Sequence, residues 1–363
     1  MGKSNKTLIK RSKISKRMRD NLITYGMIII IYVVVQFLLA GGHVSNLMQG
    51  LLVPLCVYAI LAVSLNLTVG ILGELSLGHA GFMCIGAFSG AFFSKAMQDI
   101  ITVDMIRFIL AILLGAVMAG IFGFLIGMPV LRLKGDYLAI VTLAFGEIIK
   151  NIINVFYIGK DSRGYHFSMK DSMSLKLEPE GSVIINGAQG ITGTPQNSTF
   201  TIAIIFVIIT LIIVLNLIHS RDGRAIMAIR DNLIAAESIG INITKYKLMA
   251  FSVSAALAGV AGVLYSHNIN SLMATPKNFG YNMSIMILVF VVLGGIGNIR
   301  GSVIAAVVLT LLPELLRELN DYRMLIYAIV LIVMMLFNWS PGLINFRQKI
   351  AMKLPFRRKK EVQ

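Results

Sequence analysis

The sequence predicts an all-α membrane protein: a polytopic bundle of about ten transmembrane helices, broken by glycine-rich segments. The 363 residues are 56% hydrophobic and 14% charged, with a mean hydropathy of +0.80, whereas soluble domains typically carry about 25% charged residues. Several apolar runs reach the roughly 20 residues that a helix needs to cross a bilayer. Strongly basic stretches flank the apolar part at both ends. These observations exclude an ordinary soluble enzyme.

The basic stretches fix the expected orientation. Residues 1–24 and 341–363 together hold +13 of the formal charge of +16. Because this charge flanks spans, we expect it to meet anionic membrane lipid and not nucleic acid. The positive-inside rule puts both termini in the cytoplasm, so the number of spans is even.

Ten apolar segments satisfy this parity. The predicted spans are residues 25–40, 47–69, 76–93, 105–128, 136–157, 201–218, 248–266, 284–293, 302–316 and 324–337. The chain then divides into a basic arm (1–24), a first transmembrane half (25–218) with an extracytoplasmic loop (158–199), a polar cytoplasmic segment (219–247), a second transmembrane half (248–340) and a basic tail (341–363).

Two glycine-rich breaks, at residues 70–82 and 294–301, stand on either side of the polar segment. Non-helical backbone at membrane depth persists only where protein buries it or where it lines a cavity. Paired breaks in the two halves of a transporter also indicate an internal repeat and the translocation route. The residues predicted to line this route are Glu74, Ser76, Gly78, His79, Gly294, Gly295 and Gly297, together with Glu147 from the span 136–157.

Two ionisable residues of the predicted spans, Glu147 and His79, each have two interpretations. Glu147 precedes Lys150 by three residues, a spacing at which an ion pair neutralises both side chains. Glu147 is therefore either half of a structural pair or a titrating group of the route. His79 is either a packed, hydrogen-bonded side chain or part of the route. Proton transfer through Glu147 and His79 would mark a secondary transporter.

Small residues recur at GxxxG spacing in Gly86/Gly90, Gly123/Gly127 and Gly297/Gly301. Such pairs let helix backbones approach closely in lipid. The pattern favours packing within one subunit over a subunit interface.

The polar segment 219–247 reads as two short helices joined by a hinge. Asp231 is a candidate N-cap for the second helix, and Gly240 is a natural left-handed stop. Ile226, Ile229 and Leu233 fall at helical spacing and predict an apolar stripe on a polar surface. The segment either presents this stripe to a partner or is an ordinary basic loop that fixes topology.

Catalytic signatures are missing from the sequence. It has no GxxxxGK[ST], HExxH, GxSxG or CxxC motif. Its two cysteines, Cys56 and Cys84, fall in predicted spans and form no metal or disulfide framework. We therefore expect no enzyme activity and no cofactor or metal in this chain. If it transports a solute, a partner or an ion gradient supplies the energy; a non-transporting assembly subunit is a further alternative.

Four blocks carry a family likeness: GELSLGHAGFMCIGAF (73–88), LRLKGDYLAIVTLAFGEI (131–148), residues 223–266, and VVLGGIGNIRGSVIAAVVLTLLPELLR (291–317). Their order and spacing resemble the LivM-type permease, the membrane subunit of the ABC importer for branched-chain amino acids. Similar permeases carry other amino acids, amides and urea.

This resemblance implies a coupling role for 219–247, with an EAA-like motif docking into a cytoplasmic ATPase. The coupling residues it implies are Arg224, Ile226, Ile229, Leu233, Ala235, Ala236, Glu237 and Gly240. It also implies a LivH-like second permease, LivG- and LivF-like ATPases that bind the ATP and Mg, an extracytoplasmic substrate-binding protein, and a place in the bacterial cell membrane.

Overall fold

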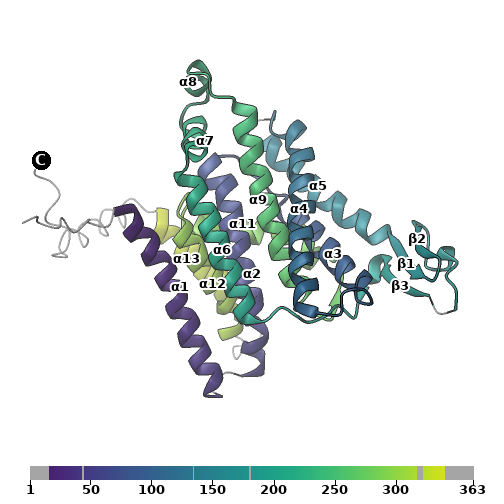
Figure 1. Cartoon of the computed structure of the whole chain (residues 1–363). Helices are drawn as coiled ribbons and strands as arrows, with labels where there is room; N and C mark the ends of the chain where they lie inside the picture. The colour runs from purple at the N-terminus through teal and green to yellow at the C-terminus, as the bar shows by residue number, and fades with distance from the viewer. Residues whose placement is uncertain (1–15, 43–44, 134, 180, 317–321, 340–363) are drawn as a thin grey trace, which may run out of the picture. The chain divides into compact units, whose positions relative to one another are not determined.

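The computed structural model describes residues 16–42, 45–133, 135–179, 181–316 and 322–339. The chain forms two compact units, Met1–Asn46 and Leu47–Gln363. In the first unit, the described residues form one helix, α1 (Lys16–Ala40). The second unit holds the elements described below (Figure 1).

The first half of the second unit follows the predicted spans with one shift. Its helices are α2 (Asn46–Asn66), α3 (His79–Ala96), α4 (Asp104–Val130) and α5 (Asp136–Val155). Helix α2 stays continuous through Pro54 and runs on as a π-helix, η1 (Leu67–Leu72). Helix α3 begins at His79 and not at residue 76 as predicted, because Gly73 leaves the helix with φ of +81° and residues 73–78 are non-helical.

Helix α9 (Ile243–Ser266) packs against both α3 and α4. Glycines make these contacts close. A Cβ on Gly86 would lie 2.3 Å from the carbonyl oxygen of Gly259, and one on Gly123 would lie 2.5 Å from the Cβ of Ala255. Since both partners belong to this chain, the predicted packing of these two GxxxG segments within one subunit is confirmed.

The segment between α5 and α6 departs from the all-α prediction, because it folds into a sheet. Strands β1 (Tyr157–Asp161), β2 (Gly164–Ser168) and β3 (Ser182–Asn186) pair antiparallel in the order β2-β1-β3. A second pair, β4 (Ile191–Thr192) with β5 (Ser271–Leu272), ties the segment to the chain that follows α9. Short 3-10 turns at Met173–Leu175 and Gly187–Gln189 complete it.

The predicted two short helices after α6 (Phe200–His219) are confirmed as α7 (Arg221–Asp231) and α8 (Leu233–Ser238). Figure 1 shows them at one end of the helices of the second unit, away from the three-stranded sheet. The cap of α8 is Asn232, whose side chain accepts the N–H of Ala235, and not Asp231 as predicted, because α7 continues through Asp231. Gly240 has φ of +83°, as expected for the stop.

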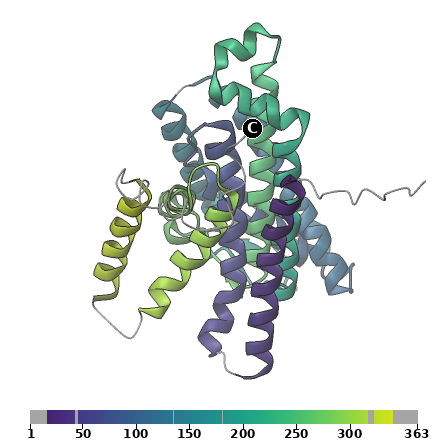
Figure 2. The ribbon, with the colours of Figure 1, turned by 90° about the vertical axis from the view of Figure 1, so that its left-hand side faces the viewer.

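The second half holds α10 (Pro276–Phe279), α11 (Tyr281–Gly294), α12 (Ile299–Leu315) and α13 (Arg323–Trp339). Helices α12 and α13 both contact α11. Figure 2 shows them in the yellow-green to yellow part of the ribbon.

Six helical segments among the described residues are long and apolar enough to cross a membrane. They are Met48–Leu72, Asp104–Val130, Asp136–Val155, Phe200–His219, Ile243–Ser266 and Pro276–Gly294. Helices α12 and α13 are each 17 residues long. The prediction of about ten spans is therefore not confirmed, although helices occupy all ten predicted segments.

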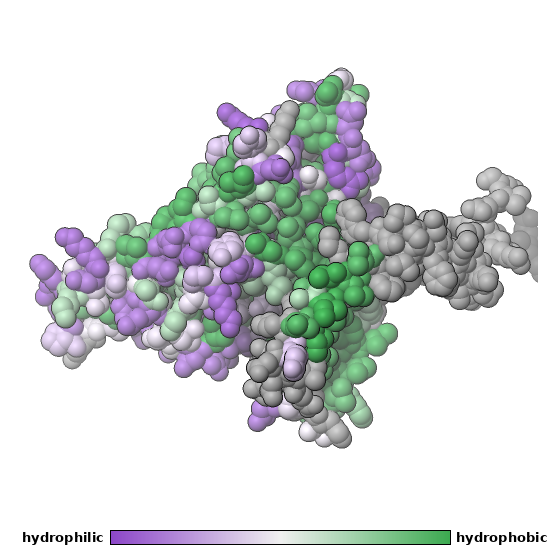
Figure 3. All heavy atoms as spheres, turned by 180° about the vertical axis from the view of Figure 1, so that it is seen from behind, coloured by the Kyte–Doolittle hydropathy of each residue, from purple (hydrophilic) through white to green (hydrophobic). Residues whose placement is uncertain are grey.

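The surface of the second unit fits a lipid environment. Helix α4 exposes large apolar side chains along its length, among them Leu113, Val117, Phe124 and Leu125. Figure 3 shows a hydrophobic middle between hydrophilic residues at the α7–α8 end and over the sheet. Helix α6, in contrast to α7, is mostly apolar, with its one titratable residue, His219, in the last turn.

Candidate functional site: the junction of the two breaks

The two glycine-rich breaks, far apart in sequence, meet in the structure. A Cβ on Gly70 would lie 2.4 Å from the backbone nitrogen of Gly297, so the two backbones leave no room for a side chain. Asn66, which is fully buried, joins them. Its Oδ1 accepts the N–H of Gly297 at 2.8 Å, and its Nδ2 donates to the hydroxyl of Ser302 at 2.8 Å. We call Asn66, Gly70, Gly297 and Ser302 the break junction.

The π-helix η1 supplies the Gly70 side of this junction. All six of its residues are buried. The carbonyl of Thr68 accepts the N–H of Gly73, five residues later, which is the π pattern. Since the chain leaves the helix at Gly73, the carbonyls of the last turn lack later helical donors. Single π-turns are found frequently at functional sites.

Arg230, on α7, reaches this open end. Its Nη1 donates to the carbonyl of Gly70 at 2.9 Å, and its Cγ packs against Gly73, where a Cβ would lie 2.6 Å away. Its Nε and Nη2 bind Asp231. Sequence reasoning missed Arg230, because nothing distinguishes it from the other arginines of α7.

Glu74 forms an ion pair with Lys247 on α9. Both side chains are largely buried, with 15% of Glu74 and 6% of Lys247 exposed. A buried pair needs both partners, because removing one leaves an uncompensated charge. The predicted route residue Glu74 therefore anchors the break to α9.

The other predicted residues of the first break are packed. Ser76, Gly78 and His79 are buried. A Cβ on Gly78 would lie 2.3 Å from the carbonyl oxygen of Thr142 on α5. His79 Nε2 lies 2.7 Å from Ser64 Oγ, whose hydroxyl also donates to the carbonyl of Leu61. Of the two alternatives for His79, the structure therefore shows the packed, hydrogen-bonded side chain.

Gly294, Gly295 and Gly297 form the second break, a tight turn between α11 and α12. Gly295 and Gly297 have φ of +94° and +82°, values that favour glycine. A Cβ on Gly294 would lie 2.4 Å from the carbonyl carbon of Gly301, so the turn closes on the start of α12.

Glu147 forms the predicted ion pair with Lys150. Its Oε1 also accepts the N–H of Tyr281 at 2.7 Å, at the start of α11. Within the described parts of the chain, no hydrogen bond joins Glu147 to His79. The structure therefore gives Glu147 structural partners and does not link it to the break junction.

The predicted apolar stripe of α7 and α8 needs correction, because most of it is buried inside the chain. Ile226 and Ile229 are 0% and 3% exposed, and Leu233 is half-buried. Ile226 packs in a cluster with Leu67, Ile71, Leu72 and Ala250. Helix α7 thus rests on the π-helix through apolar contacts as well as through Arg230.

The residues exposed around α8 are different ones. Ala235, Glu237 and Gly240 are exposed, as is Arg224 on α7, whereas Ala236 is buried. Ile234 and Ile239, which the stripe did not include, are 75% and 76% exposed. Among residues 221–247, these two are the large apolar side chains that are exposed.

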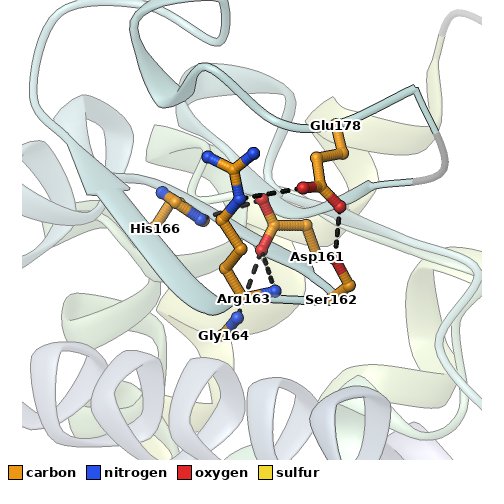
Figure 4. Close-up of polar contacts among 6 residues, drawn as sticks. All are labelled: Asp161, Ser162, Arg163, Gly164, His166 and Glu178. Atoms are coloured by element: carbon orange, nitrogen blue, oxygen red, sulfur yellow. Dashed lines mark hydrogen bonds and ion pairs between the residues drawn. The ribbon is translucent and has the colours of Figure 1, made fainter.

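A separate polar cluster organises the turn between β1 and β2 (Figure 4). Asp161, whose side chain is 1% exposed, accepts the N–H groups of Arg163 and Gly164 and lies 2.9 Å from His166. Burial raises the pKa of this carboxyl, but the bonds from Arg163, His166 and Gly164 outweigh it and hold the pKa below its ordinary value. Arg163 also pairs with Glu178 at 2.8 Å.

Comparison with known proteins identifies the class of this chain. Residues 47–337 match the family described as branched-chain amino acid transport system / permease component. The match covers most of the chain and both breaks of the junction. The chain belongs to this family of multi-pass membrane permeases.

Within the family, the chain is similar to LivM proteins. It is 34% identical over 294 residues to the high-affinity branched-chain amino acid transport system permease protein LivM of Salmonella typhimurium, covering 78% of this chain and 67% of the relative. Identity to LivM of Escherichia coli K12 is 33% over 307 residues, with the same coverage. Identity to LivH of Salmonella typhimurium is 23% over 257 residues, covering 69% of this chain and 79% of the relative. No solved structure matches the chain.

Proposed function

We propose that this chain is the LivM-like permease subunit of an ABC importer that carries branched-chain amino acids across the bacterial cell membrane. The observation that carries the proposal is the family match over residues 47–337, which includes α7 and α8 as well as both breaks. Similarity to both LivM and LivH supports a second, LivH-like permease as the membrane partner.

In this proposal, separate ATPase subunits bind ATP and Mg and drive the permease, and an extracytoplasmic protein delivers the substrate. The basic termini and the α7–α8 end face the cytoplasm, in keeping with the positive-inside rule. The sheet between α5 and α6 then faces the outside. The break junction moves with the helices that enclose the route.

The docking surface for an ATPase is the exposed part of α8 and its C-terminal turn. It comprises Ile234, Ala235, Glu237, Ile239 and Gly240. Burying one isoleucine side chain stabilises a contact by about 1.5–3 kcal/mol. Losing both would therefore weaken association by at least about 100-fold.

The test is the double variant Ile234→Ser with Ile239→Ser, expressed with its native partner subunits. We expect the ATPases to stop copurifying and the uptake of radiolabelled L-leucine to fall with them. Met173→Ser is the matched control, because Met173 is 88% exposed on the α5–α6 segment. Normal copurification together with normal uptake in the double variant would refute the docking surface.

The alternative function, a proton-coupled secondary transporter working alone, depends on proton transfer through Glu147 and His79, and the contacts of these two residues do not support it. Glu147 is held by Lys150 and by the backbone of Tyr281. His79 is paired with Ser64. A proton relay would need a hydrogen-bonded path between these two groups.

A further inference from the structure

We propose that Arg230 is the positioning residue through which movement of α7 reaches the break junction, with the π-helix η1 as the element that changes conformation. This inference rests on the proposed function, and it names how the coupling end and the breaks communicate. It starts from the hydrogen bond between Arg230 Nη1 and the carbonyl of Gly70.

Gly70 is the point where three parts of the chain meet. It belongs to the π-helix, it abuts Gly297 of the second break, and its carbonyl accepts Arg230 from α7. Asn66, one turn earlier, binds the N–H of Gly297. A displacement of Gly70 toward Gly297 therefore requires Gly297 to move, because the backbones leave no free space between them.

The π-helix is the natural element to change. Its hydrogen bonds run to the carbonyl five residues earlier, whereas those of an α-helix run to the fourth, and its last carbonyls have no helical donors. Arg230 supplies a charged donor to one of these carbonyls, which stabilises the π form while α7 rests on the bundle. When α7 is drawn away, that donor leaves, and rewinding of residues 67–72 shifts the register of Gly70 against Gly297.

The connection is specific to one side chain. Ile226 holds α7 to the same cluster by apolar contact, which has no preferred direction. The Arg230 bond has a fixed donor, a fixed acceptor and a second anchor on Asp231. Lys247 holds Glu74, four residues after Gly70, to α9 and not to α7. In the described parts of the chain, Arg230 is thus the hydrogen-bonded link from α7 to η1.

The first test measures coupling in the purified complex of the chain with its native partner subunits, reconstituted in liposomes. The quantity is L-leucine taken up per ATP hydrolysed. A charge-assisted hydrogen bond is worth about a ten- to hundredfold change in an equilibrium constant. Because Arg230 is partly exposed, with 38% of its side chain accessible, we expect the lower end of this range. Arg230→Gln should lower the ratio about tenfold while the complex still assembles.

Two further variants separate coupling from structure. Arg230→Lys keeps one charged donor and should recover part of the ratio. Arg221→Gln removes a charge from the exposed first turn of the same helix and should leave the ratio unchanged. A wild-type ratio in Arg230→Gln would overturn the inference. So would a variant that loses assembly, hydrolysis and uptake together, because Arg230 would then serve assembly only.

The second test does not depend on transport. Hydrogen exchange of the amides of residues 69–74 is measured in the full chain, wild type and Arg230→Gln. We expect faster exchange in the variant, with exchange in the β1–β3 sheet unchanged. Equal exchange in both proteins would overturn the inference. If the wild-type complex takes up no leucine but the exchange result holds, the proposed function fails and the Arg230 link stands.

Discussion

Asn66 offers the sharpest test of the break junction. The variant Asn66→Ala removes the acceptor of the Gly297 N–H and the donor to the Ser302 hydroxyl. Each lost hydrogen bond costs about 1 kcal/mol, and a buried donor left without a partner costs about 1–3 kcal/mol. Gly297 is half-buried, and the Ser302 hydroxyl keeps a second hydrogen bond to the carbonyl of Asn298. We therefore take the low end of the energy range for each of the two lost hydrogen bonds.

The expected loss is therefore about 2–3 kcal/mol of stability, once the small cavity at a fully buried position is included. Thermal unfolding of the purified chain in detergent measures it as a fall of several degrees in Tm. Asn151→Ala is the matched control, because Asn151 is exposed on α5, and it should leave Tm unchanged. A Tm for Asn66→Ala equal to that of the wild type would refute the reasoning that this residue joins the two breaks.

Three further predictions follow from other contacts. Gly86→Leu puts a side chain against the backbone of Gly259, where even a Cβ would meet the carbonyl oxygen at 2.3 Å, so α3 and α9 must separate. Overpacking of this kind costs about 1–3 kcal/mol of stability, which should appear as a lower Tm. Lys247→Ala strands the buried carboxylate of Glu74 and should cost about 3–5 kcal/mol, whereas adding Glu74→Ala should restore part of this stability. The pKa of Asp161 is lowered in the folded protein, so the stability that its carboxylate gives the β1–β2 turn is complete above the ordinary carboxyl pKa of about 4. This stability is lost as pH falls through the lowered value. Hydrogen exchange of the turn amides, measured against pH, should show the loss.

Each of these predictions has a contrary result. An unchanged Tm for Gly86→Leu would mean that the two helices do not touch at this point. A double variant less stable than Lys247→Ala alone would mean that Glu74 has other partners. Turn amides that stay equally protected down to pH 2, after correction for the intrinsic rate, would remove Asp161 from the account.

The approximate positions of the apolar helices could be predicted from the sequence because they follow the hydropathy pattern. Each apolar run of the second unit became a helix near the expected residues, and the first break was visible from its glycines. The stop at Gly240 was equally local, since a left-handed residue after a short helix favours glycine. The N-cap was misassigned by one residue because Asp231 and Asn232 are both good caps.

The parts that could not be predicted depend on distant partners. Nothing in residues 67–72 distinguishes a π-helix from the end of an α-helix, and the backbone that Gly70 meets, at Gly297, is distant in sequence. The sheet of β1 and β3 needs pairing across more than twenty residues, which a loop with near-neutral charge does not reveal. The spacing of Ile226 and Ile229 correctly placed both on one apolar face of a helix. Periodicity does not predict whether that face is covered by the same chain or by a partner.

The source of energy distinguishes an ATP-driven importer from a proton-coupled transporter. Membrane vesicles that hold the chain with its native partner subunits and substrate-binding protein are given radiolabelled L-leucine, with ATP or with an imposed pH gradient. We expect uptake that requires ATP and persists when the proton gradient is collapsed. Uptake driven by the pH gradient without ATP would contradict this expectation.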